Sequence, residues 1–127
     1  MFINPDQLRR YTVGVLVDNE PGVLSRVSGL FSRRGFNIES LAVGPTQDRE
    51  ISRITIVVLG DDAHIEQLVQ QLYKLICVQK VQVMQSRNAV ERQLLLVKVK
   101  AGVAEREGLM RLVDIFKARC STSPSPR

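Results

Sequence analysis

Residues 19–27 read Asn-Glu-Pro-Gly-Val-Leu-Ser-Arg-Val, and residues 34–41 read Arg-Gly-Phe-Asn-Ile-Glu-Ser-Leu. In the first run, a Pro-Gly turn connects a predicted strand to a predicted helix. In the second run, a glycine ends that helix and a second predicted strand follows. The helix start offers unpaired backbone N–H groups and an amide side chain, which suit a small carboxylate. Neither run pairs a nucleophile with a base, so together they favour recognition of an amino acid over catalysis.

Hydrophobic periodicity around these runs predicts the other elements of one domain. Helical spacing predicts a helix at 23–34 and a second helix capped by residues 60–62. The predicted strands lie at 10–17, 36–43, 52–59 and 78–84. The expected buried stripes are Leu24, Val27, Leu30 and Phe31 in the first helix, and Ile65, Leu68, Val69, Leu72 and Leu75 in the second.

The order strand–helix–strand–strand–helix–strand predicts an α+β fold, the ferredoxin-like βαββαβ sandwich. Both helices are expected on one face of a four-stranded antiparallel sheet. The other face must be covered or solvated. Because much of the sheet is apolar on both faces, we expect this bare face to pair with another copy of the chain.

The C-terminal segment predicts an incomplete second β-α unit. Residues 94–99 are expected to form a strand and residues 105–118 a helix, but one strand and one helix make no independent core. We therefore predict a domain at 9–86, a partial domain at 87–119 and a disordered tail at 120–127.

Composition narrows the function classes. The chain is 44% hydrophobic and 24% charged over 127 residues, as expected of a globular domain. Residues 1–86 hold nine Lys or Arg and nine Asp or Glu, whereas residues 87–127 hold nine and four, so the net charge of +5 lies in the C-terminal segment. A balanced domain without Trp argues against a nucleic-acid partner. No apolar stretch reaches membrane-spanning length, so we expect no membrane partner.

The two cysteines, Cys77 and Cys120, lie far apart without a C-x-x-C partner. This usage indicates a reducing compartment and no disulfide framework. We expect the cytoplasm, or the plastid stroma if a transit peptide precedes this sequence. The only histidine, His64, has no serine or cysteine partner nearby in sequence, and we interpret it as a solvated surface residue.

The runs at 19–27 and 34–41 resemble the ACT domain of the acetolactate synthase (acetohydroxyacid synthase) small regulatory subunit family. The resemblance covers residues 9–101, and the long run at 34–41 is its most specific part. Runs 52–56 and 90–98 are similar to that family as well. The pattern that carries it is Asn19-x-x-Gly22-x-Leu24-x-Arg26-Val27, followed by Gly29-Leu30-Phe31.

The resemblance implies a subunit that is not itself an enzyme and holds no cofactor or metal. Its implied partner is the catalytic large subunit, which carries thiamine diphosphate, a divalent metal and FAD. The implied effector is valine, leucine or isoleucine, bound between the ACT domains of a homodimer, and the implied role is feedback regulation of branched-chain amino acid biosynthesis. Family members carry a full second domain, so residues 87–119 are expected to be a truncated regulatory domain.

By position, the family's effector site corresponds to two parts of this chain. The effector-binding turn comprises Asn19, Gly22, Val23 and Leu24, and the facing contribution from the neighbouring protomer comprises Asn37 and Ile38.

Spacing alone leaves plainer interpretations open. Asn19 and Gly22 can be ordinary turn residues, and Leu24 and Ile38 can be ordinary core. One methylene is worth about 0.8 kcal/mol, so pocket composition does not choose among the branched-chain amino acids. Two other functions also remain open, namely a free-standing ACT amino-acid sensor that regulates another enzyme or a transcription factor, and a small RNA-binding module.

Overall fold

The computed structural model describes residues 8–85 and 88–121. The chain divides into two compact units, residues 1–91 and residues 92–127, which we describe separately.

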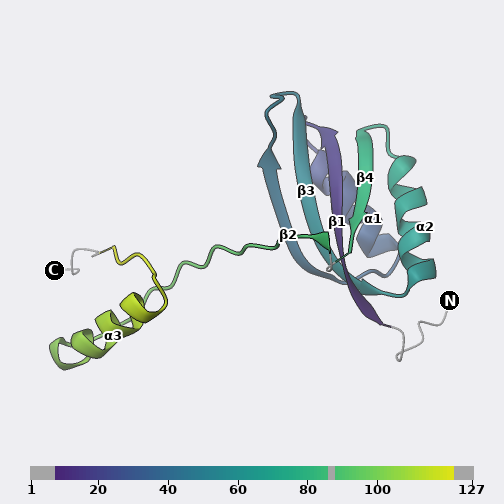
Figure 1. Cartoon of the computed structure of the whole chain (residues 1–127). Coiled ribbons are helices and arrows are strands. Elements are labelled where there is room, and N and C mark those ends of the chain that lie inside the picture. Colours follow the sequence, from purple (N-terminus) through teal and green to yellow (C-terminus); the bar gives the residue numbers. More distant parts are fainter. Residues whose placement is uncertain (1–7, 86–87, 122–127) are drawn as a thin grey trace. The chain divides into compact units, whose positions relative to one another are not determined.

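The first unit is a four-stranded antiparallel sheet with two helices (Figure 1). Its strands follow the order β2-β3-β1-β4, so β2 and β4 are the two edges. The ferredoxin-like α+β fold is therefore confirmed. The elements along the chain are β1 (Arg9–Asp18), α1 (Val23–Arg33), β2 (Ile38–Pro45), β3 (Ile51–Gly60), α2 (Asp62–Tyr73) and β4 (Val78–Met84).

The core forms where alternating strand residues meet the helix stripes. Val13 and Val15 of β1 are fully buried and pair with Ile56 and Ile54 of β3. These side chains cluster with buried residues of both helices, so both helices pack on the same face of the sheet. The buried residues of the helices are Val23, Val27, Leu30 and Phe31 in α1, and Ile65, Leu68 and Leu72 in α2.

The prediction that Leu24 is buried in the core is wrong. Leu24 is 43% exposed, whereas its neighbour Val23 is only 4% exposed. Successive helical residues are rotated by about 100°, so a stripe centred on Val23, Val27 and Phe31 turns Leu24 toward solvent. Of the residues expected in the buried stripe of the second helix, Val69 is only partly buried, and Leu75 lies two residues beyond the end of α2 and is also only partly buried.

The bare face of the sheet is less apolar than expected. Leu16 and Val57 are half-buried there, but Arg53 and Lys80 are exposed on the same face. A Cβ added at Gly14 would meet the Met84 side chain at 2.9 Å, so Met84 lies over this glycine and covers part of the face. The pairing of this face with another copy stays a prediction.

The second unit lacks its predicted strand. Residues 94–99 form no strand, and Leu94 and Leu96 are 86% and 87% exposed. A strand needs a neighbour for its N–H and C=O groups, and the described residues of this unit, 92–121, contain no second strand. The β part of the predicted second β-α unit is therefore wrong.

The predicted C-terminal helix is present as α3 (Val103–Ile115). It begins two residues earlier than predicted, where the Gly102 N–H donates to Glu105 Oε2 at 2.9 Å. It ends three residues earlier than predicted, before Lys117 adopts a positive φ of 51°. None of its residues is buried. The predicted tail at 120–127 lies mostly outside the described residues and stays a prediction.

Candidate functional site

Asn19 ties the turn after β1 to the loop between β2 and β3. Its backbone N–H donates to the Glu50 carbonyl at 2.7 Å, and its Nδ2 donates to the Arg49 carbonyl at 2.9 Å. It therefore does not cap α1, although it is a turn residue. Its Oδ1 accepts no hydrogen bond from the described part of the chain, which leaves this exposed oxygen available to a donor from outside.

Gly22 starts α1 in a conformation that favours glycine. Its φ is 85°, in the left-handed region, and a Cβ added at this position would have no atom within 4 Å. For other residues this conformation costs about 1–2 kcal/mol, which explains the glycine without any steric demand inside the chain. The open space beside Gly22 lets another molecule approach the helix backbone closely.

The first turn of α1 leaves hydrogen-bond donors exposed. The Val23 N–H makes only a long bond of 3.4 Å to the Glu20 carbonyl, and α1 has neither a side-chain cap nor an acidic residue in its first turn. In the described residues, no acceptor bonds the N–H groups of Leu24 and Ser25. These donors and the helix dipole together favour a bound anion.

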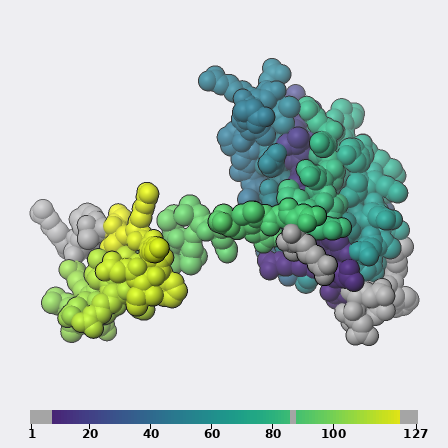
Figure 2. Space-filling model, in the orientation of Figure 1, coloured from purple at the N-terminus to yellow at the C-terminus, as the bar shows by residue number. Residues whose placement is uncertain are grey.

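Three apolar side chains, one on the first turn of α1 and two on β2, lie exposed, and we call Leu24, Leu41 and Val43 the apolar margin. Leu41 and Val43 pair with Ile56 and Ile54, so they belong to the helix-covered face of the sheet. They are nevertheless 37% and 49% exposed, because β2 is an edge strand that the helices leave uncovered. In Figure 2 the residues of β2, coloured blue, lie at the surface along one side of the first unit.

Asn37 and Ile38 lie at the opposite end of the sheet from Asn19. Both β1 and β2 run antiparallel to β3, so the start of β2 lies at the end of the sheet where β1 starts. Ile38 pairs with Val58, which pairs with Tyr11, and Asp18 lies seven residue steps along β1 from Tyr11. This corresponds to about 23 Å. One copy of the chain therefore does not bring Asn19 and Asn37 together around an amino acid.

The interpretation of His64 as a solvated surface residue is wrong. Its side chain is only 12% exposed, and its Nδ1 lies 2.8 Å from Asp61 Oδ1. Its ring also meets Phe36 edge-on, with centroids 6.1 Å apart. The Asp61-x-x-His64 spacing at a helix start could have indicated the first contact, but the contact with Phe36 joins residues far apart in sequence.

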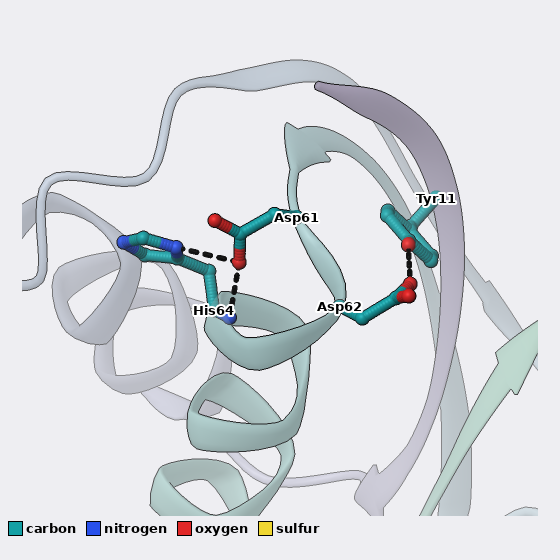
Figure 3. Close-up of polar contacts among 4 residues, drawn as sticks. All are labelled: Tyr11, Asp61, Asp62 and His64. Carbon is teal, nitrogen blue, oxygen red and sulfur yellow. Dashed lines mark hydrogen bonds and ion pairs between the residues drawn. The ribbon is translucent and has the colours of Figure 1, made fainter. Parts of the chain in front are cut away.

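Two acidic residues at the start of α2 have separate partners (Figure 3). Asp61 accepts hydrogen bonds from the His64 backbone N–H and ring, which hold the pKa of its carboxyl below the usual range. Asp62 instead accepts a hydrogen bond from the Tyr11 hydroxyl. That bond, aided by burial, raises the pKa of Tyr11. Asp61 is thus a helix cap, as predicted, rather than half of an acid–base pair.

The sequence pattern of the AHAS small subunit-like ACT domain matches residues 13–80 of this chain. The chain belongs to this family. The matched segment contains every residue predicted to bind the effector, from Asn19 to Ile38.

Relatives from three kinds of organism support this membership of the acetolactate synthase small-subunit family. A probable acetolactate synthase small subunit of Archaeoglobus fulgidus is 52% identical over 110 residues, which cover 87% of this chain and 69% of that protein. The acetolactate synthase small subunit of Mycolicibacterium smegmatis is 50% identical over 86% of this chain and 64% of that protein. The chloroplastic small subunit 2 of Arabidopsis thaliana is 47% identical over 90% of this chain and 24% of that protein.

Solved structures agree with the family. The crystal structure of the acetolactate synthase small subunit from Thermotoga maritima aligns with a TM-score of 0.75 and 33% identity, over 91% of this chain and 73% of that one. The ACT domain of a Chlorobium tepidum GTP pyrophosphokinase aligns with a TM-score of 0.57 over 68% of this chain and 94% of that domain. Its identity is 15%, so this likeness concerns the fold alone. No helix in the described residues is both long and apolar enough to cross a membrane.

Proposed function

We propose that this chain is a regulatory subunit of acetolactate synthase that binds a branched-chain amino acid between two copies of its ACT domain. Occupancy of this site would modulate the thiamine-diphosphate-dependent catalytic large subunit, while the chain itself takes no part in the chemistry. The single observation that carries the proposal is the first turn of α1, which combines unpaired N–H donors and Gly22 with an exposed Leu24.

The chemistry of this turn fits a hydrophobic zwitterion. The N–H groups of Leu24 and Ser25 can donate to a carboxylate, with the helix dipole adding about 0.3–2 kcal/mol. The unused Oδ1 of Asn19 can accept from an ammonium group. The exposed side chain of Leu24 offers apolar contact to an aliphatic side chain. Each end of the amino acid thus has a complementary group.

The dimer that completes this site would form through the edge of β2. The other edge is partly closed, because the Tyr73 hydroxyl accepts from the Val81 N–H at 3.1 Å and donates to the Val81 carbonyl at 3.3 Å. Along β2, by contrast, the apolar margin leaves Leu41 and Val43 exposed. Edge strands with exposed apolar residues favour pairing with another strand.

A two-fold pairing of β2 strands would also join the two halves of the site. In an antiparallel pair, the start of the partner's β2 lies beside the end of β2 in the first copy. The start of β2 follows Asn37, and the end of β2 lies at the end of the sheet where α1 begins. The partner's Asn37 and Ile38 would then face Gly22 and Leu24, whereas in a single copy the start of β2 and the start of α1 lie at opposite ends of the sheet.

Regulation requires that the effector bind one state of the complex more tightly than another. An effector held between two copies meets this condition whenever the relative position of the copies differs between active and inactive enzyme. The compartment, cytoplasm or plastid stroma, and the absence of nucleic-acid and membrane partners stay predictions.

The proposal is tested by combining the full chain with an acetolactate synthase large subunit. We expect the two to co-purify, and we expect valine, leucine or isoleucine to change the activity of the complex. Calorimetry on the chain alone should show binding of the same amino acid. Effector binding without co-purification would favour the free-standing sensor, and a chain that binds no branched-chain amino acid would refute the proposal.

A further inference from the structure

The segment that carries Asn37 rests on an aromatic contact with α2. Phe36, which directly precedes Asn37, meets Phe31 of α1 and His64 of α2, with ring centroids 6.1 Å apart in both pairs. Both contacts are edge-on, with interplanar angles of 69° and 81°. Edge-to-face packing is a favoured aromatic geometry, so the place of Phe36 depends on where the His64 ring lies.

The His64 ring is itself held in place. Asp61 accepts from the His64 backbone N–H and lies 2.8 Å from its Nδ1, so one carboxylate oxygen fixes both the helix start and the ring (Figure 3). The side chains of His64 and Asp61 are 12% and 16% exposed. Hydrogen bonds to a charged group in such a partly buried position hold a side chain more firmly than exposed ones.

The polar side-chain contacts of residues 34–39 lie at the surface. Arg10 Nε lies 3.1 Å from Glu39 Oε2, but the Arg10 side chain is 68% exposed. Arg34 Nη2 donates to Gln71 Oε1 at 2.9 Å, also at the surface. Exposed ion pairs contribute about 0–1 kcal/mol and exposed side chains remain mobile. The Phe36 N–H donates to the Phe31 carbonyl at 3.0 Å, which ties the connection to α1. Among the described side-chain contacts between this connection and α2, the ring contact of Phe36 with His64 is therefore the one best placed to hold the connection against α2.

We propose that His64 is a positioning residue for the effector site. Through Phe36 it sets the place of Asn37, and thereby the affinity of the site that Asn37 completes in the neighbouring copy. This inference rests on the proposed function, because it concerns the same site. His64 itself would touch no effector, since it lies behind Phe36 on α2.

The test measures valine binding by calorimetry on the full chain, with thermal unfolding followed in parallel. His64→Leu removes both the aromatic edge and the contact with Asp61, and should weaken valine binding about two- to tenfold. His64→Phe keeps an aromatic ring against Phe36 but loses the ring's hydrogen bond with Asp61, and should recover part of the affinity that His64→Leu loses. A merely structural role would instead lower the unfolding temperature of both variants and leave their valine affinities alike.

A matched control removes the other side-chain hydrogen bond at the start of α2, which comes from Tyr11 of β1. Tyr11→Phe removes the hydrogen bond to Asp62 without touching Phe36, and should leave valine affinity unchanged. A double-mutant cycle between His64→Leu and Phe36→Leu should show that the two losses of affinity are not additive.

The outcomes separate the two proposals. If the natural chain binds no branched-chain amino acid, the proposed function fails. If the natural chain binds valine and folded His64→Leu binds it equally well, or if the two losses simply add, the positioning role of His64 is overturned while the effector site stands.

Discussion

Gly22→Asp should abolish effector binding while barely changing stability. No atom lies within 4 Å of an added Cβ, so the substitution causes no clash within the chain. Its cost arises from the φ of 85° and should be about 1 kcal/mol, because Asp tolerates the left-handed region better than most residues. A carboxylate at a helix start contributes about 0.3–1 kcal/mol of stabilisation, which offsets part of that strain.

The effect on binding should be far larger. The new carboxylate would lie where the effector carboxylate is expected, and two unit charges about 4 Å apart repel by about 4 kcal/mol at an effective dielectric of 20. Allowing for rotation of the side chain away from the effector, we expect valine affinity to fall by at least about a hundredfold. Gly22→Asn is the matched control, since it has the same size and backbone preference without the charge.

Calorimetry with valine gives the affinity, and urea denaturation gives the free energy of unfolding. We expect Gly22→Asn to bind valine more tightly than Gly22→Asp, with both variants folded. A folded Gly22→Asp chain that binds valine as the natural chain does would refute the assignment of the α1 start as the carboxylate site.

Three other substitutions test the dimer edge, the core and the α2 cap. Val43→Lys should convert the dimer to a monomer by placing a charge on the apolar margin, whereas Leu59→Lys, on the bare face of the sheet, should leave a dimer that forms through β2 intact. Light scattering distinguishes the two, and a dimeric Val43→Lys chain together with a monomeric Leu59→Lys chain would favour pairing through the bare face instead. Phe31→Ala should lower the free energy of unfolding by about 3–5 kcal/mol, because this ring is fully buried, and a urea titration that shows a loss below about 1 kcal/mol would contradict that packing. Asp61→Asn should lower the free energy of unfolding near neutral pH, because the hydrogen bonds from His64 stabilise the ionised carboxyl of Asp61. The difference in unfolding free energy between the natural chain and the variant should shrink as the pH falls below about 3.9 toward the lowered pKa of Asp61 in the folded state, and a difference that stays constant from about pH 7 to about pH 3 would contradict this role of Asp61.

Local pattern predicted most of the fold. The alternation of Val13, Val15 and Val17 and the helical spacing of Val27, Leu30 and Phe31 located elements whose bounds agree with the structure to within about two residues. Turn chemistry around Gly22 and Gly35 placed both ends of α1, where the structure has positive φ values. These signals act over a few residues, so the sequence carries them without knowledge of the partners.

The failures all concern partners distant in sequence. Residues 94–99 have a strand-like composition, but a strand forms only when another strand accepts its hydrogen bonds. His64 looked like a surface residue because Phe36, which buries it, precedes it by 28 positions. Leu24 looked like core because periodicity does not reveal the direction in which a helix turns its stripe toward the sheet.

The sequence likewise predicted the local features of the candidate site but not the features that depend on distant segments. Residue types and spacing near Asn19 and Gly22 already indicated a helix start suited to a carboxylate, because backbone donors and glycine conformations are local properties. Strand order and register determine two further features of the site. They place Asn37 at the far end of the sheet, and they leave Leu41 and Val43 uncovered on an edge strand. Strand order depends on contacts between segments far apart in the chain, and only the folded arrangement of β1, β2 and β3 reveals it.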